Sequence, residues 1–315
     1  MATSATPLAA VHAAFAGLID YAGLFPPAQL GMKEALAEYA AARKSPNAWM
    51  LARFIVPESR VTELLNCRTE SDDGRLSMSV IVDASDDPRA WFGRVQGALA
   101  RVAELNASGS VHIEALEIAL PPLLSLRETY DATVGQYAAA AAQAGLGNLC
   151  SFVEVPRSDR RQALLPGAIA AMHRHRLGAK LRCGGVNADA VPPVLDVATF
   201  LVEARDEDVP FKATAGLHHP IRGYNEQNGF VMHGFVNLLV AAVLAKSGAS
   251  VDDLIAALED DHADHFSLDS ESLVWSGRAL SAEVVAETRA QSFISYGSCS
   301  FDEPVSDLRS LGMIA

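Results

Sequence analysis

Two lysines in neighbouring strand-like segments are the residues best placed to carry out chemistry. Lys180 lies within the segment 178–183, and Lys212 lies within the segment 210–215. A stretch of helical length separates the two segments, which is typical of consecutive parallel strands in a βαβ unit. In a closed barrel such strands are neighbours, which would place both ammonium groups in one interior. Like charges held together in a poorly hydrated site favour the loss of a proton, and a neutral amine is a nucleophile.

The alternation of side chains along a strand predicts which other charged groups share that interior. Leu116 and Ile118 should face the surrounding helices, so Glu117 between them is expected to point inward. The same argument turns Arg182 inward. Parity does not decide the direction of Glu154, but this residue lies at the carboxyl end of its strand, where barrel active sites form. Buried charges are costly unless they are paired, so these groups form either a structural ion network or a functional site.

Strand-like and helix-like segments alternate along the whole chain. Strands are expected at residues 18–25, 52–56, 76–82, 112–120, 149–155, 178–183, 210–215 and 266–275. The clearest helices are expected at residues 8–17, 32–43, 86–105, 126–144, 159–176, 231–246, 250–259 and 282–291. This order predicts one domain over residues 1–315, an α/β fold of the (β/α)8 TIM-barrel type with a short N-terminal helix and a C-terminal extension. The alternative is an open doubly wound sheet, although the first strand lacks the glycine-rich phosphate turn of that fold.

Composition narrows the class of protein. The chain has 315 residues, of which 50% are hydrophobic, and a net charge of −13, which argues against a nucleic-acid-binding surface. The four cysteines are widely spaced, which is typical of reduced thiols, and no signal peptide or membrane-spanning run is evident. We therefore expect a cytoplasmic protein with no nucleic-acid or membrane partner, which forms a homo-oligomer.

The segments around the two lysines resemble the deoxyribose-phosphate aldolase family, which are Schiff-base (class I) aldolases on a (β/α)8 barrel. The sixth strand of that family reads roughly lysine-threonine-serine-threonine-glycine, and residues 180–184 here read Lys-Leu-Arg-Cys-Gly. The seventh strand of the family reads roughly phenylalanine-lysine-proline-alanine-glycine-glycine, and residues 211–216 here read Phe-Lys-Ala-Thr-Ala-Gly. The fourth-strand carboxylate of the family precedes a proline by four residues, as Glu117 precedes Pro121.

The resemblance covers the middle of the chain, mostly residues 112–219, and it implies roles for three residues. Lys180 would be the Schiff-base lysine, and Lys212 would be the second lysine, whose charge favours the neutral form of the first. Glu117 would take the carboxylate role. The resemblance therefore implies an aldolase that needs no cofactor and no metal.

The candidate substrate-binding residues follow the two lysine strands. They are Arg182, Gly184, Gly185, Thr214, Gly216, His218 and Arg222. The family binds phosphate at glycine-rich turns after its last two strands, whereas the expected eighth strand here carries Asp269 and Glu271. One of the two arginines could instead hold a carboxylate of the substrate. The polar segment 220–229 is long enough to act as a lid.

Three functions follow from these residues. The first is a carbon–carbon lyase or aldolase that acts on a small carbonyl substrate, which could be anionic, through catalytic residues Lys180, Lys212, Glu117 and Glu154. The second is a metal-dependent lyase, isomerase or hydrolase, with ligands drawn from His218, His219, Asp20, Asp83, Glu154 and Asp269. The third is a non-catalytic barrel that binds a small anion.

Other residues with chemical potential lie outside these sets. His262 and His265 have helical i, i+3 spacing and could bind a metal, although such a run is also typical of a solvated helix end. Cys183 is expected to point away from the lysines. Cys299 lies in an expected loop, and the sequence shows no base to partner it.

Overall fold

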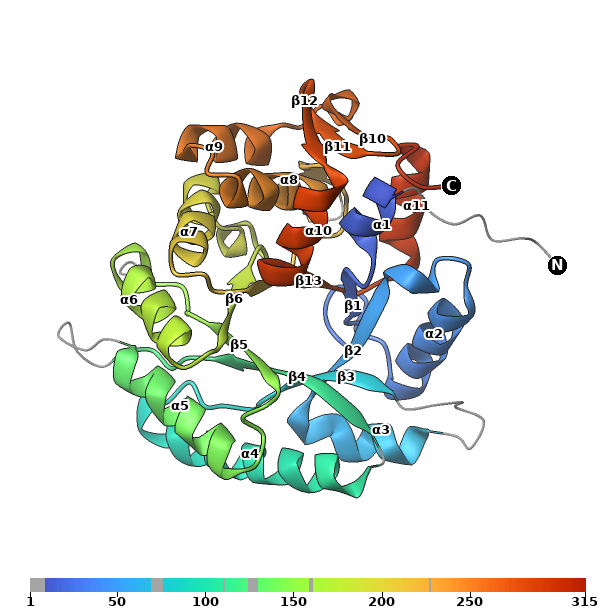
Figure 1. Cartoon of the computed structure of the whole chain (residues 1–315). Helices are drawn as coiled ribbons and strands as arrows, with labels where there is room; N and C mark the ends of the chain where they lie inside the picture. Colours follow the sequence, from blue (N-terminus) through green and yellow to red (C-terminus); the bar gives the residue numbers. More distant parts are fainter. Residues whose placement is uncertain (1–8, 69–75, 110, 124–129, 159–160, 227) are drawn as a thin grey trace.

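A closed barrel of parallel strands forms the centre of the protein. The computed structural model describes residues 9–68, 76–109, 111–123, 130–158, 161–226 and 228–315. Around the barrel the strands are β1 (Ile19–Tyr21), β13 (Phe293–Ser298), β7 (Phe211–Thr214), β6 (Gly178–Arg182), β5 (Cys150–Glu154), β4 (His112–Ala119), β3 (Ser77–Ile81) and β2 (Leu51–Pro57) (Figure 1). Parallel pairing of β1 with both β2 and β13 closes the ring. The predicted (β/α)8 TIM barrel is therefore confirmed, and the open-sheet alternative is wrong.

Helices surround the strands, as Figure 1 shows in the view along the barrel. They are α1 (Ala9–Phe15), α2 (Met32–Lys44), α3 (Val61–Cys67), α4 (Pro88–Ser108), α5 (Asp131–Gln143), α6 (Arg161–Arg174), α7 (Val194–Asp206), α8 (Phe235–Lys246), α9 (Val251–Glu259), α10 (Ala282–Gln291) and α11 (Asp302–Ser310). The predicted N-terminal helix corresponds to α1. The predicted starts of α5 and α6, at residues 126–129 and 159–160, lie outside the described residues.

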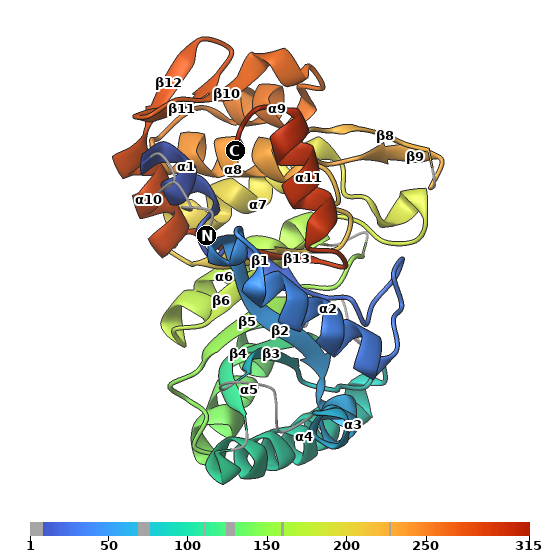
Figure 2. The same cartoon turned by 90° about the vertical axis from the view of Figure 1, so that its right-hand side faces the viewer.

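Shorter elements connect the barrel units. The 3-10 helices are η1 (Ala48–Met50), η2 (Glu58–Arg60), η3 (Ala188–Ala190) and η4 (Ala263–His265). An antiparallel hairpin is formed by β8 (Gly223–Asn225) and β9 (Phe230–Met232), and it lies on the side of the barrel opposite α1 (Figure 2). The predicted lid loop 220–229 therefore contains a strand and the turn of a hairpin.

The last barrel strand is not where the sequence analysis placed it. The segment predicted as the eighth strand, residues 266–275, forms β10 (Phe266–Leu268) and β11 (Ser272–Trp275), which pair in an antiparallel sheet with β12 (Arg278–Ser281) outside the barrel. The eighth barrel strand is β13, between β1 and β7. Residues 293–298 complete the barrel, and α11 follows them as a C-terminal extension.

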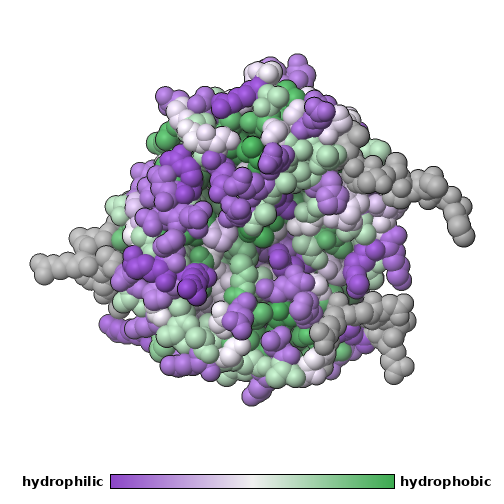
Figure 3. All heavy atoms as spheres, viewed as in Figure 1, coloured by the Kyte–Doolittle hydropathy of each residue, from purple (hydrophilic) through white to green (hydrophobic). Residues whose placement is uncertain are grey.

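Apolar burial explains why these segments form the elements that they do. On β2 and β3, residues such as Phe54, Val56, Met78 and Val80 are fully buried. The apolar helix α8 is buried from Phe235 to Ala245, as its composition predicts. On the face seen in Figure 3, hydrophilic residues are interspersed with smaller hydrophobic areas. No helix in the described part of the chain combines the length and apolarity that a bilayer crossing requires.

Candidate active site

A cavity with a volume of about 420 Å³ lies at the carboxyl ends of the barrel strands. Glu117 of β4 and Lys180 of β6 contribute charged groups to its lining. Other lining residues come from the turns after β6, β7 and β13 and from the segment after β1; they include Gly184, Gly185, Gly216, Cys299, Pro26 and Pro27. This is the end of the barrel at which TIM-barrel enzymes carry their active sites.

Lys212 is completely buried beneath the cavity. Its Nζ donates hydrogen bonds to Asp20 Oδ2 at 2.6 Å and to Glu117 Oε1 at 2.5 Å. Each carboxylate has a second donor, Ser295 for Asp20 at 2.7 Å and Ser79 for Glu117 at 2.6 Å. Burial alone would lower the pKa of Lys212, but the two carboxylates raise it above its ordinary value. Lys212 is therefore a fixed ammonium group at neutral pH.

Lys180 is the lysine that lines the cavity, with 6% of its surface exposed. It is the register partner of Lys212 across β6 and β7. Its Nζ lies 2.9 Å from Glu117 Oε2 and 3.5 Å from Glu154 Oε2. The two lysines thus contact different oxygens of one buried carboxylate. Glu117 Oε2 is buried, and its polar contact among the described residues is this ion pair with Lys180.

The carboxylates are held in their ionised form by the cations around them. Burial would raise the pKa of Glu117, but Lys180 and Lys212 lower it far below its usual range. Burial would also raise the pKa of Glu154, but Lys180 and Arg182 lower it. Arg182 Nε donates to Glu154 Oε1 at 2.7 Å, so Glu154 bridges an arginine of the cavity wall and the cavity lysine.

A histidine and a thiol meet at the same cavity. His218 Nδ1 lies 3.6 Å from Cys299 Sγ and 3.6 Å from Glu303 Oε2. Burial would lower the pKa of His218, but its hydrogen bonds with Cys299 and Glu303 raise it to about 9. Both His218 and Cys299 line the cavity. The expectation that Cys299 has no base partner is wrong, because the fold joins residues that are 81 positions apart.

The turns after the two lysine strands pack against each other through their backbones. Gly216 has a φ angle of +75°, and a Cβ atom at this position would lie 2.8 Å from the Cα atom of Gly184. Only residues without a side chain allow so close an approach. Glycine is therefore required on steric grounds at the positions four residues after Lys180 and Lys212, where the two turns meet and close the cavity wall between β6 and β7.

Most of the sequence-predicted residues lie at this cavity, but three do not line it. Glu117, Lys180, Arg182, Gly184, Gly185, Thr214, Gly216 and His218 are all lining residues. Lys212 and Glu154 are behind the cavity wall, where they contact Glu117 and Lys180 respectively. Arg222 is not among the described lining residues, and its backbone N–H donates to Asn237 Oδ1 at 2.7 Å.

The sequence analysis missed Asp20 as a partner of the second lysine. It listed Asp20 among possible metal ligands, whereas Asp20 binds Lys212 and Ser295 in the barrel interior. A carboxylate within the apolar strand segment at residues 18–25 was the available signal. Ser79 and Ser295 carried no such signal, since a serine on a strand is common.

The predicted ligands of a metal-dependent barrel have separate partners. His219 Nδ1 lies 2.7 Å from Asp307 Oδ2, and Asp83 accepts a hydrogen bond from the backbone of Ser59 at 2.7 Å. Asp269 caps the turn that precedes Ser272, outside the barrel. These side chains do not converge on a common point in the described structure.

The sequence has no recognised relatives among the protein families and curated proteins with which it was compared. No protein-family model matches the chain, and no curated protein sequence matches it. Among solved structures, the chain is similar to a deoxyribose phosphate aldolase from Aeropyrum pernix, which is described as having a unique tetrameric structure. The two share 12% sequence identity with a TM-score of 0.49, over 95% of this chain and 93% of that one.

Proposed function

We propose that this protein is a carbon–carbon lyase of the class I aldolase type, in which Lys180 forms a Schiff base with a small carbonyl substrate. The observation that carries the proposal is that the two lysines differ in their access to the cavity and in their hydrogen bonds. Lys180 reaches the cavity, whereas Lys212 is fully buried and hydrogen-bonded to two carboxylates. One amine is therefore accessible to substrate, and the other is a permanent positive charge beside it.

Lys180 must be neutral in order to react, and it is the register partner of the positively charged Lys212 across β6 and β7. An ammonium group cannot attack a carbonyl, so Lys180 must first transfer a proton. Glu154 and Glu117, which lie 3.5 Å and 2.9 Å from its Nζ, are the nearest acceptors.

The reaction then follows from the chemistry of an iminium ion. The amine of Lys180 adds to the substrate carbonyl, and the proton that it gave to the carboxylate returns to the hydroxyl group that leaves as water. The carboxylate is thereby restored, and the resulting iminium withdraws electrons from the adjacent carbon–carbon bond. A base removes the proton of the β-hydroxyl group as this bond breaks, which releases an aldehyde and leaves an enamine on the lysine. Glu117 lines the cavity and its Oε2 lies 2.9 Å from Lys180 Nζ, so this carboxylate is our candidate for the base. Protonation of the enamine and hydrolysis of the iminium return the free lysine.

The cavity wall favours an anionic carbonyl substrate. Arg182 and His218 both line the cavity, and the pKa of His218 is raised to about 9 by hydrogen bonding that outweighs its burial. Two cationic donors in the lining of one cavity can bind a carboxylate or a similar anion. A non-catalytic barrel that binds such an anion would use the same two groups. The role of Lys180 therefore distinguishes the aldolase from the non-catalytic barrel.

Reductive trapping tests the role of Lys180. The protein is treated with sodium borohydride in the presence of short aldehydes, oxo acids and sugars, and the modified lysine is located by peptide mass spectrometry. We expect an adduct on Lys180, with no adduct in the Lys180→Arg variant. The exposed Lys33, changed to arginine, is the control and should leave trapping unaffected.

The Lys180→Arg variant should then lose turnover but keep ligand binding. With any substrate that gives an adduct, aldehyde release should fall by about 1,000-fold or more, as is usual when a nucleophile is removed, while ligand binding persists. Aldehyde release at the wild-type rate, or adducts spread over exposed lysines alone, would contradict the proposal.

A further inference from the structure

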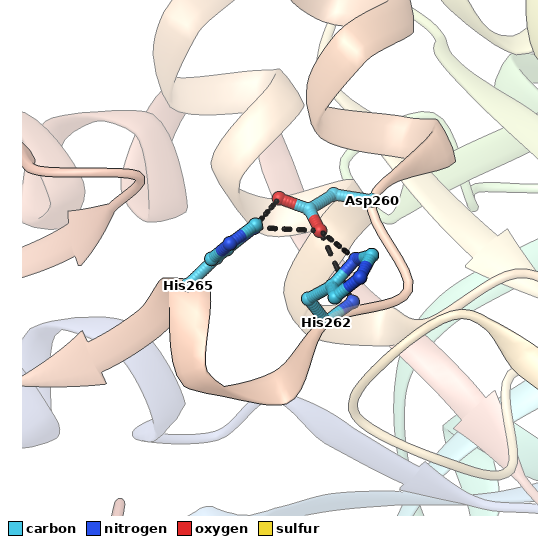
Figure 4. A group of neighbouring side chains, drawn as sticks. All are labelled: Asp260, His262 and His265. Carbon is cyan, nitrogen blue, oxygen red and sulfur yellow. Dashed lines mark hydrogen bonds and ion pairs between the residues drawn. The ribbon is translucent and has the colours of Figure 1, made fainter.

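Three potential metal ligands converge after the end of α9, apart from the cavity. They are Asp260, His262 and His265, and Figure 4 shows the carboxylate of Asp260 between the two imidazole rings. His265 Nδ1 lies 3.0 Å from Asp260 Oδ1 and 2.9 Å from Asp260 Oδ2. His262 Nδ1 lies 3.5 Å from Asp260 Oδ1. The ligand atoms of all three residues lie within 4.8 Å of one another.

We propose that these three residues form a binding site for a transition-metal ion of the zinc class. Tetrahedral zinc with bond lengths of about 2.0–2.1 Å places neighbouring ligand atoms about 3.3–3.4 Å apart. The observed 2.9–3.5 Å between the imidazole nitrogens and the carboxylate oxygens brackets this separation. The ion would therefore require only small side-chain movements. Two imidazoles and one carboxylate suit zinc, cobalt or nickel rather than calcium or magnesium, which prefer oxygen ligands.

The central carboxylate is held in place by neighbours that are not ligands. Trp275 Nε1 donates to Asp260 Oδ2 at 2.9 Å, and the backbone N–H of His262 donates to Oδ1 at 3.1 Å. The backbone carbonyl of Asp260 accepts from Asn237 Nδ2 at 2.8 Å. Such outer contacts orient a ligand before the ion arrives and contribute to metal affinity.

The two rings are also arranged for joint use. The imidazoles of His262 and His265 are stacked, with centroids 4.9 Å apart and planes inclined by 21°. His265 Nδ1 lies 2.9 Å from Asp260 Oδ2, and His262 Nδ1 lies between Asp260 Oδ1 at 3.5 Å and Asp261 Oδ1 at 3.0 Å. Both side chains are partly open to solvent, with 66% and 42% of their surface exposed, so the fourth position of a tetrahedral ion is available to water.

An ion at this position would tie an outer sheet to the helical layer. Asp260 is the C-cap of α9, and His265 directly precedes β10. Trp275, which orients the carboxylate, is the last residue of β11. Metal binding should therefore stabilise the connection between α9 and the β10–β11–β12 sheet.

Metal titration of the full chain tests the site. After dialysis against a chelator, zinc binding is measured by calorimetry and cobalt binding by visible absorption at neutral pH. We expect one ion per chain and a rise in the unfolding temperature with zinc. His262→Ala and His265→Ala should each bind at least about tenfold more weakly, and Trp275→Phe should lose about tenfold through the outer contact.

The controls distinguish this site from other metal-binding groups. The double variant His173→Ala/His175→Ala also removes two exposed histidines, and it should bind zinc as the wild type does. Binding that is absent, or that survives both single histidine substitutions, would show a simple histidine–aspartate ion pair and overturn the proposal. A thiolate-to-cobalt charge-transfer band would also overturn it, because the proposed site contains no cysteine.

Discussion

Replacement of Glu117 by glutamine tests whether the charges beneath the cavity form one buried network. Glu117 is 0% exposed, contacts both lysines through separate oxygens, and accepts a hydrogen bond from Ser79. Glutamine keeps the shape but removes the charge, and its amide group must face one of the lysine ammonium groups as a second donor. Loss of one partner of a buried ion pair costs about 3–5 kcal/mol.

This cost converts to a measurable shift in unfolding temperature. An unfolding entropy of about 2.1 cal/mol/K per residue, over 315 residues, gives about 0.66 kcal/mol/K for the chain. The Glu117→Gln variant should therefore unfold about 5–8 °C below the wild type in calorimetry at neutral pH. The natural control is Glu114→Gln, on the same strand, because Glu114 is 33% exposed and pairs with Arg53. Its loss should stay below about 1 kcal/mol.

The difference between wild type and Glu117→Gln should also depend on pH. Burial would raise the pKa of Glu117, but the two lysines lower it, so its contribution is present above the unfolded carboxyl pKa of about 4.3. That contribution is lost as the pH falls through the lower folded value. The gap in unfolding temperature should therefore narrow below about pH 4. Equal losses for Glu117→Gln and Glu114→Gln at neutral pH would refute the buried network.

Two further predictions concern the cavity rim. Burial would lower the pKa of His218, but its hydrogen bonds, first of all the one with Cys299, raise it to about 9. The protonated histidine therefore stabilises the folded protein by up to about 3 kcal/mol. This contribution is fully present below about pH 6.5 and is lost as the pH rises through 9. Denaturant unfolding of His218→Gln should therefore differ most from the wild type at acidic pH and converge with it above pH 9, and a constant difference would contradict this assignment. The free energy of unfolding of Gly216→Ala should fall by about 1–3 kcal/mol because of backbone strain, and it should fall further because the new Cβ atom contacts Gly184. Gly248 also has a positive φ angle, but a Cβ atom there would have no neighbour within 4 Å, so the free energy of unfolding of Gly248→Ala should fall by the strain contribution alone. Equal decreases in the two variants would show that the close approach of Gly216 to Gly184 does not require glycine.

The sequence by itself determined the barrel type and the inward direction of the main charged groups. Side chains alternate with a period of two along any strand, so the aliphatic neighbours of Glu117 fix its direction without knowledge of the partner strands. The same local rule places Lys180 and Lys212 in one interior once their segments are consecutive parallel strands. The glycines after both strands were also visible in the sequence, although their mutual contact was not.

Only the tertiary structure decided which segment closes the barrel and which groups complete the site. The sequence predicted the eighth strand at residues 266–275 and none at residues 293–298, because the position of the closing strand depends on hydrogen bonds to the open edges of β1 and β7 rather than on local pattern. Closure brings Asp20 to Lys212 across 192 positions, and it brings Cys299 to His218 across 81. Such contacts leave no periodic trace in the sequence, because their energy comes from groups that only the closed ring brings together.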